Sequence, residues 1–300
     1  MPIRVANAPC SWGVLEFNDH AQALDCSRVL DELASTGYAG TELGDWGFMP
    51  TDPPALRAEI ARRALTLVGA FVPVNLSDPA AHGEGAERAV RTATLLRDAG
   101  YPNAFVVLAD MTEGNAARIA VAGRAGDTDG LSPTQWDVLA RGADVIAREV
   151  RHHTGLRTVF HPHCGSFVET ANEVDALMAR TEPALLGLCL DTGHLTYAGA
   201  DPLAVFERYR DRVWHVHFKD CEPLIAAEAR RTRTDYFSAV RQGVFCELGH
   251  GSVDFPRLLE SMRRGGYDGW IVVEQDVLPA LGTPAQSAER NRRYLRTLGL

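Results

Sequence analysis

The chain has 300 residues, of which 46% are hydrophobic, and a formal net charge of −9, so it is long and apolar enough to bury a large core. The acidic balance and the lack of a Lys/Arg-rich run argue against a nucleic-acid partner, which needs a basic footprint. The sequence has no apolar run of membrane length and no apolar signal in Met1–Val5, which predicts a cytoplasmic protein without a membrane partner. Its six cysteines include no C-x-x-C pair, which is typical of an enzyme with reduced thiols.

Short apolar runs alternate with helical segments along the whole chain. Strands are predicted at Arg4–Ala8, Gly40–Leu43, Thr66–Val74, Ala104–Leu108, Thr158–Phe160, Leu185–Leu190, Val213–Val216 and Trp270–Val273. Helices are predicted at Ala21–Ser35, after Pro53-Pro54, and at Glu84–Ala99, Pro133–His152 (with Ser132 as N-cap), Asn172–Arg180, Pro202–Tyr209, Asp254–Arg264 and Thr283–Leu298. This rhythm is typical of parallel βαβ units, and eight such units close a barrel. We therefore predict an α/β fold, a single (β/α)8 barrel domain over residues 1–300.

Two stretches interrupt the rhythm. Residues 110–130 follow the fourth predicted strand, and residues 221–251 follow the seventh. Both come after the carboxyl end of a strand, where the active-site loops of such a barrel lie. We predict them to be loop insertions that act as lids.

Polar side chains follow the carboxyl ends of several predicted strands. In a (β/α)8 barrel these ends meet at one mouth. Carboxylates, imidazoles and an ammonium are costly to place beside a core unless something uses them, and a divalent metal is the commonest user. The residues at these positions are Glu42, His161, His163, Asp191, His194, His217, Lys219 and Glu274.

Three of the carboxylates also have structural interpretations. Glu274 could form a salt bridge with a buried arginine, and Asp191 could cap the turn that follows it. Glu42 could bind substrate hydroxyls or form a salt bridge within the barrel.

The histidines occur in pairs with a spacing of two, which places both rings of a pair on one face of the chain. His217 lies nearer the mouth than His215 and is the predicted ligand, whereas His215 is expected to pack with a hydrogen bond. His161 lies closest to its apolar strand and is the other predicted imidazole ligand, so that His163 would reach the substrate. Lys219 shares the face of His217, where its ammonium can stabilise an oxyanion, unless it is a solvated loop lysine.

Five motifs carry a resemblance to a known family. They are NAPCSWG (residues 7–13), GYAGTELG (37–44), HPHCG (161–165), DTGH (191–194) and HVHFKD (215–220). In these motifs the chain resembles the myo-inosose-2 dehydratase family of the xylose isomerase-like TIM barrels, a superfamily that also holds sugar epimerases and endonuclease IV. The first two motifs are characteristic of the dehydratase branch, whereas DTGH and the glutamate after the last strand mark the wider superfamily.

The resemblance implies one divalent metal ion as cofactor. Members of the superfamily typically bind it with Glu, Asp, His and Glu from strands 5 to 8, and Asp191, His217 and Glu274 match the last three. The strand-5 position is His161 instead, so either His161 ligates or Glu169 folds back to supply a carboxylate. A set with two imidazoles and two carboxylates suits Mn, Fe, Co or Zn better than Mg.

The implied activity is dehydration of a cyclic ketopolyol such as 2-keto-myo-inositol through an enediolate. His163 would act as base or acid, and His194 would hydrogen-bond a substrate hydroxyl or carry protons. Lys219 would stabilise the enolate oxygen, and Glu42 would bind substrate hydroxyls. The expected partner is thus a small polyol or keto sugar, and the enzyme would be a lyase of inositol catabolism.

The sequence also bears on three other functions. A metal-dependent isomerase or epimerase of keto sugars shares the enediolate, but such enzymes usually work with carboxylates on strands 5 and 8, and His161 weakens this alternative. Cleavage of damaged DNA needs a multi-metal cluster and a basic groove, neither of which the sequence contains. A binding protein with an inactive barrel would not need the metal ligands. The substrate stereochemistry, the metal and the oligomeric state stay open, and a homo-oligomer is compatible with the sequence.

Overall fold

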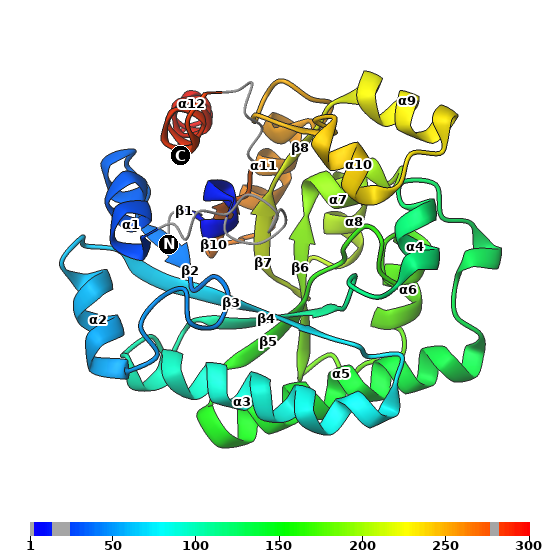
Figure 1. The fold of residues 1–300 in the computed structure, drawn as a ribbon, viewed down its shortest axis with the longest axis horizontal. Helices are drawn as coiled ribbons and strands as arrows, with labels where there is room; N and C mark the ends of the chain where they lie inside the picture. The colour runs from blue at the N-terminus through cyan, green and yellow to red at the C-terminus, as the bar shows by residue number, and fades with distance from the viewer. Residues whose placement is uncertain (1–2, 14–24, 277–281) are drawn as a thin grey trace.

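The apolar runs form the wall of a closed barrel. The computed structural model describes residues 3–13, 25–276 and 282–300. Within these ranges eight parallel strands close in the order β1, β10, β7, β6, β5, β4, β3, β2 (Figure 1). The strands are β1 (Arg4–Asn7), β2 (Gly40–Glu42), β3 (Thr66–Val74), β4 (Phe105–Asp110), β5 (Arg157–Phe160), β6 (Leu186–Asp191), β7 (Val213–Phe218) and β10 (Trp270–Val273). The predicted (β/α)8 barrel is therefore confirmed.

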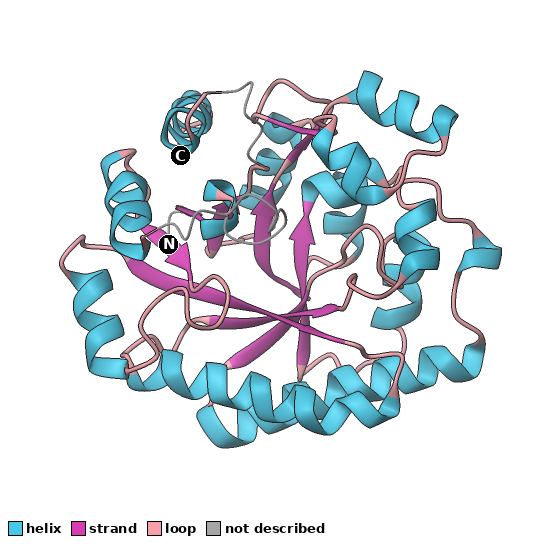
Figure 2. Cartoon of the chain, in the orientation of Figure 1, coloured by secondary structure: helices cyan, strands magenta, loops and turns pink. Residues whose placement is uncertain are grey.

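Helices surround this wall (Figure 2). The outer ones are α1 (Cys26–Ser35), α2 (Pro53–Ala61), α3 (His82–Asp98), α5 (Pro133–Thr154), α6 (Ala171–Met178), α8 (Pro202–Arg208), α11 (Phe255–Arg264) and α12 (Pro284–Thr297). Most start behind a side-chain cap. Asp52 and Ser132, for example, each accept a backbone N–H of the first turn and precede a proline, and losing one such cap costs about 1 kcal/mol. Asp25 caps α1 in the same way, and residues 21–24 of the helix predicted there lie outside the described residues.

Side chains alternate between the two faces of the barrel wall, as the pleat of a strand requires. In β6 and β7 the outward residues Leu190, Val216 and Phe218 are fully buried against the outer helices. The inward residues of the same strands include His215 and His217, which are also fully or almost fully buried. The apolar core thus lies between the strands and helices, while polar side chains point into the carboxyl end of the barrel.

The two predicted insertions are folded, helical segments. The first contains α4 (Ala116–Val121), and the second contains α9 (Pro223–Thr232), α10 (Tyr236–Arg241) and a two-stranded ribbon of β8 (Asp220–Cys221) and β9 (Phe245–Cys246). Figure 1 shows α4 and α10 on the same side of the barrel, where they contact each other. Apolar side chains from both insertions and from α7 (Thr192–Tyr197) form a second buried cluster, which includes Ala122, Tyr197, Tyr236 and Phe245. The two insertions therefore pack together at one side of the barrel and form helices, where the sequence predicted loops.

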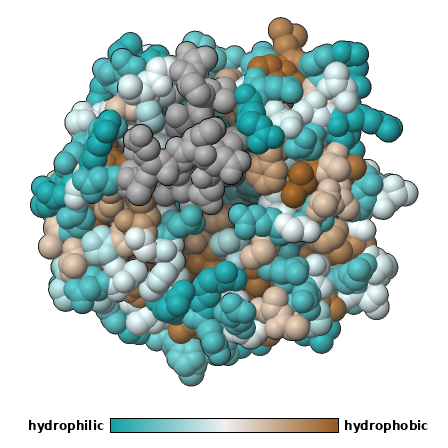
Figure 3. Space-filling view, viewed as in Figure 1, coloured by the Kyte–Doolittle hydropathy of each residue, from teal (hydrophilic) through white to brown (hydrophobic). Residues whose placement is uncertain are grey.

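Few large hydrophobic side chains are exposed among the described residues. On the face shown in Figure 3 hydrophobic residues are interspersed with hydrophilic ones. Among the described residues, the large hydrophobic side chains that are exposed are Trp46 and Leu224. None of the described helices combines the length and the apolar character that crossing a bilayer requires.

Candidate metal centre and active site

Four predicted ligands meet at the carboxyl end of the barrel. His161 follows β5, Asp191 ends β6, His217 lies in β7 and Glu274 follows β10, and one ligand atom from each lies within 4.8 Å of all the others. Asp191 Oδ2 is 3.5 Å from His161 Nε2 and 3.9 Å from His217 Nδ1. The same Nδ1 is 3.1 Å from Glu274 Oε1. Residues from distant parts of the sequence thus face one small volume.

Three of these facing atoms make no regular hydrogen bond. His161 Nε2, Asp191 Oδ2 and His217 Nδ1 are all buried and lack a hydrogen-bond partner. A buried polar atom left in this state costs about 1–3 kcal/mol, so three at one point indicate that another group belongs there. Two imidazoles and two carboxylates suit a first-row divalent cation, and the two carboxylates would balance its charge. The side chains present therefore fit the metal that the sequence implies.

Glu42 supports this arrangement from within the barrel. Its Oε1 lies 3.0 Å from His217 Nε2 and 2.8 Å from His215 Nε2. Burial alone would raise the pKa of this carboxyl, but His217 and His215 outweigh it and lower the pKa to about 2. The carboxylate can therefore accept from both rings, which directs His217 Nδ1 at the other ligands. A Cβ at Gly69 would come within 2.8 Å of Glu42 Oε1, so a larger residue there would displace the carboxylate from the two rings.

Glu42→Gln is expected to weaken metal binding by about 10- to 100-fold, the usual effect of removing an outer partner of a ligating imidazole. The amide cannot accept from both rings as a carboxylate does. Titration against a chelator would measure the change. Glu32→Gln is a suitable control, because Glu32 accepts from Trp12 Nε1 outside the barrel mouth. An unchanged affinity in Glu42→Gln would show that Glu42 does not orient His217.

The Asp-Thr-Gly-His turn joins the ends of β6 and β7. Asp191 Oδ1 accepts the backbone N–H of His194 at 2.7 Å and caps α7, which leaves Oδ2 for the ligand cluster. Thr192 Oγ1 donates to the Lys219 carbonyl at 2.6 Å and accepts the Lys219 N–H at 3.0 Å. A Cβ at Gly193 would lie 2.5 Å from Lys219 Cγ, so glycine lets the lysine side chain pass. The capping role considered for Asp191 and its place among the ligands thus use different oxygens.

His163 and His194 lie beside the ligand cluster with their ring centroids 4.1 Å apart. His163 Nδ1 is 2.9 Å from the Cys164 carbonyl oxygen, and because a carbonyl only accepts, the proton of a neutral ring lies on Nδ1. His194 Nδ1 instead accepts the Cys164 N–H at 3.3 Å, so its proton lies on Nε2, which is buried without a partner. Burial and the nearby His163 and Lys219 hold the pKa of His194 well below its ordinary value. In their neutral forms, the His163 ring thus presents an acceptor at Nε2, whereas the His194 ring presents a donor at Nε2.

Lys219 reaches the same volume from the loop after β7. Its Nζ is 3.3 Å from Glu274 Oε2 and 3.8 Å from Asp276 Oδ2, and the side chain is only 3% exposed. Burial would raise the pKa of Glu274, but His217 and Lys219 hold it well below the ordinary value. One oxygen of Glu274 therefore faces the ligand cluster while the other faces the ammonium. The solvated-lysine interpretation of Lys219 does not fit this burial.

Glu169 lies outside the four-ligand group. Its Oε1 accepts the Gly123 N–H at 2.7 Å and its Oε2 accepts the Gly165 N–H at 2.8 Å. Arg118 Nη2 lies 3.8 Å from the same Oε2. The two hydrogen bonds of this carboxylate therefore connect the first insertion to the loop after β5.

Glu169→Gln should lower the free energy of unfolding by about 1–3 kcal/mol, because an amide oxygen cannot replace both charge-assisted hydrogen bonds. Its metal content should stay that of the unmodified protein, whereas His161→Ala should lose the metal. Calorimetry and elemental analysis of both variants measure this contrast. Loss of metal in Glu169→Gln, with retention in His161→Ala, would make Glu169 the strand-5 ligand.

Two polar side chains near His163 were not predicted from the sequence. Thr112 Oγ1 lies 3.0 Å from His163 Nδ1, and the Tyr236 hydroxyl lies 3.4 Å from His163 Nε2. Each comes from one of the two insertions, and both depend on how those segments pack. Their place after strand ends was the one feature that could have marked them.

The comparisons with known proteins cover nearly the whole chain. The model of the xylose isomerase-like TIM barrel family matches residues 30–298. An inosose dehydratase of Geobacillus kaustophilus is 32% identical over 300 residues, which span 99% of this chain and 95% of that protein. Among solved structures, the probable 3-DHS dehydratase AsbF of Bacillus anthracis has a TM-score of 0.70 and 15% identity, covering 98% of this chain and 99% of that one. The IOLI protein with a bound zinc atom has a TM-score of 0.67 and 13% identity, covering 99% and 98%.

Proposed function

The chain belongs to the inosose dehydratase family of xylose isomerase-like TIM barrels, and on this basis we propose that it is a metal-dependent dehydratase of an inosose-like cyclic ketopolyol. The observation that carries this proposal is the meeting of four ligand-type side chains, three of which turn a buried atom without a hydrogen-bond partner toward the others. Beside them lie the imidazoles of His163 and His194 and the buried ammonium of Lys219, the kinds of group that an elimination next to a ketone requires.

His161, Asp191, His217 and Glu274 would hold the divalent ion. When bound there, the ion supplies Lewis acidity toward a ketone oxygen, which acidifies the neighbouring C–H bond. The mixed nitrogen and oxygen ligand set favours Mn, Fe, Co or Zn as that ion.

The hydrogen bonds of the two imidazoles support separate roles for them. His163 keeps its proton on Nδ1 against the Cys164 carbonyl, so its Nε2 lone pair can take the proton from the substrate carbon. The imidazolium then holds at Nε2 the proton that the departing β-hydroxyl needs to leave as water. His194 stays neutral and offers its Nε2–H to a substrate oxygen, which orients the ring.

Lys219 contributes charge at the same place. Its ammonium is buried beside Glu274 and over the ring of Phe245, with Nζ 4.8 Å from the ring centroid. In such a water-poor environment a fixed positive charge stabilises the negative charge that develops on the enolate oxygen. Glu42 acts indirectly here, by orienting His217, and the proposal assigns it no direct contact with the substrate.

The proposed reaction is tested with 2-keto-myo-inositol and protein loaded with Mn or Co. Dehydration should produce a dione, whose formation is followed by its ultraviolet absorbance. The isomerase or epimerase alternative predicts no such absorbance but interconversion of ketohexoses, because reprotonation then replaces elimination. That second result would overturn the dehydratase proposal and leave the metal site intact.

A further inference from the structure

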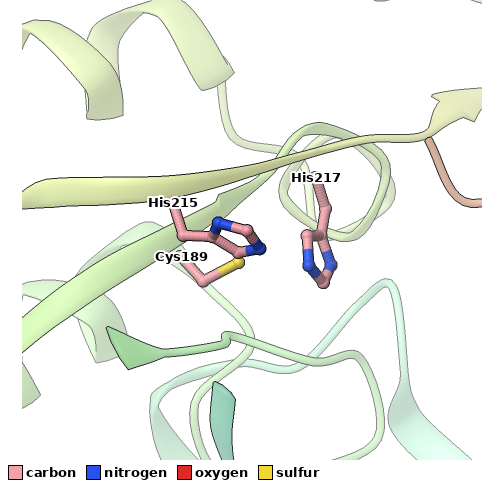
Figure 4. A group of neighbouring side chains, drawn as sticks. All are labelled: Cys189, His215 and His217. Carbon is pink, nitrogen blue, oxygen red and sulfur yellow. The ribbon is translucent and has the colours of Figure 1, made fainter. Parts of the chain in front are cut away.

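A second group of ligand-type side chains lies deeper in the barrel, next to the outer site formed by His161, Asp191, His217 and Glu274. Cys189, His215 and His217 offer a sulfur and two imidazole nitrogens within 4.8 Å of one another, and all three are buried. Figure 4 shows Cys189 and His215 side by side, with the ring of His217 next to them. The proposed mechanism does not use Cys189 or His215.

The strand register explains this arrangement. Cys189 pairs with His215 across β6 and β7, and Asp191 pairs with His217 one step nearer the mouth. Inward side chains of a parallel barrel stack in such layers. His217 therefore lies in the layer of the outer ligand Asp191, next to the layer that contains a thiol and a second imidazole.

The two nitrogens of His217 face different groups. Nδ1 lies 3.1 Å from Glu274 Oε1 in the outer site, whereas Nε2 lies 3.0 Å from Glu42 Oε1. The same Glu42 oxygen lies 2.8 Å from His215 Nε2. Two ligands of a tetrahedral zinc, each about 2.0–2.1 Å from the ion, are about 3.3 Å apart, so these atoms need only a small outward shift to accept an ion between them.

We propose that Cys189, His215, His217 and Glu42 form an inner site for a thiophilic divalent cation such as zinc. This inference rests on the proposed outer site only in that His217 is shared, with Nε2 on the side of the inner group and Nδ1 on the side of the outer one. The thiolate and the Glu42 carboxylate balance the two positive charges of the inner ion, which allows it to be buried.

The two sites differ in the ions that they favour. A thiolate with two imidazoles and a carboxylate selects zinc or cobalt, whereas manganese prefers oxygen-rich sites. The outer site, with two imidazoles and two carboxylates, accepts all three metals. Protein freed of metal should therefore take up one equivalent of manganese but two equivalents of zinc or cobalt.

The test is a count of bound metal, without substrate, after equilibration with Mn²⁺, Zn²⁺ or Co²⁺ alone. In the cobalt sample, a thiolate-to-metal charge-transfer absorption should accompany one of the two equivalents. Cys189→Ala should reduce bound zinc from two equivalents to one, abolish that absorption and leave manganese at one. Cys164→Ala is the matched control, since Cys164 is equally buried but lies outside the cluster, and it should keep both zinc ions.

One equivalent of zinc in the unmodified protein, without thiolate absorption, would overturn the inner site. So would two equivalents that persist in Cys189→Ala. Failure of the outer site gives a different pattern, in which manganese does not bind while one zinc binds and cobalt still shows the thiolate absorption. That pattern supports the inner site and contradicts the proposed metal-dependent function.

Discussion

Asp191→Asn is expected to lose the bound metal and to reduce kcat/KM by roughly a thousandfold or more, since several kcal/mol of Lewis-acid stabilisation disappear with the ion. The substitution is conservative in shape. The amide oxygen can still cap α7 through the His194 N–H, as Oδ1 does at 2.7 Å. What changes is the second oxygen, Oδ2, which faces the ligand cluster and becomes a neutral amide group that binds cations poorly. Elemental analysis after desalting, together with the turnover assay, measures both effects.

Asp201→Asn is the matched control for this variant. Asp201 also caps a helix, accepting the Leu203 N–H at 3.0 Å at the start of α8, and it lies on the exposed side of the molecule. The control should keep its metal and its turnover. If Asp191→Asn retained a full equivalent of metal and full activity, Asp191 would be a capping residue alone.

His163→Gln is expected to keep the metal and to lower kcat by about 10²–10⁴-fold, the range for removal of a proton-transfer group. Glutamine can still hydrogen-bond the Cys164 carbonyl, but it has no lone pair on nitrogen that could take the substrate proton. Metal content and turnover of the same preparation are the two readouts, since together they separate proton transfer from metal binding.

His153→Gln provides the comparison for that variant. His153 lies in the last turn of α5, and its side chain is 52% exposed. Turnover of this control should equal that of the unmodified protein. A metal-loaded His163→Gln protein with normal kcat would show that His163 does not transfer the proton. The Tyr236 hydroxyl, which lies 3.4 Å from His163 Nε2, would then be the next candidate.

The barrel and the meeting of the four candidate ligands could be predicted because both depend on local patterns. Apolar runs mark the strands, and polar residues directly after those runs must lie at the same end of a parallel barrel. His161, Asp191, His217 and Glu274 follow from this rule, and the structure brings their side chains together. The choice between His161 and Glu169 could not be made in this way, because it depends on which backbone amides of neighbouring loops the Glu169 carboxylate reaches.

Features that depend on contacts across the barrel could not be predicted from the sequence. Glu42 contacts His215 and His217 over separations of 173 and 175 residues, so neither spacing nor periodicity could distinguish these contacts within the barrel from substrate binding. The insertions were predicted as loops because their helices are short and their apolar side chains are buried in a separate cluster, against each other, α7 and the loop after β5. Tyr236 reaches His163 as a result of that packing, which no local pattern encodes.

A crystal structure of the manganese-loaded protein, with the anomalous signal of the ion, tests directly whether the four side chains at the barrel mouth bind one metal. We expect one manganese peak at about 2.0–2.2 Å from His161 Nε2, Asp191 Oδ2, His217 Nδ1 and Glu274 Oε1, as for first-row metals on such ligands. A peak bound elsewhere, or these four side chains turned away from a common ion, would contradict the account.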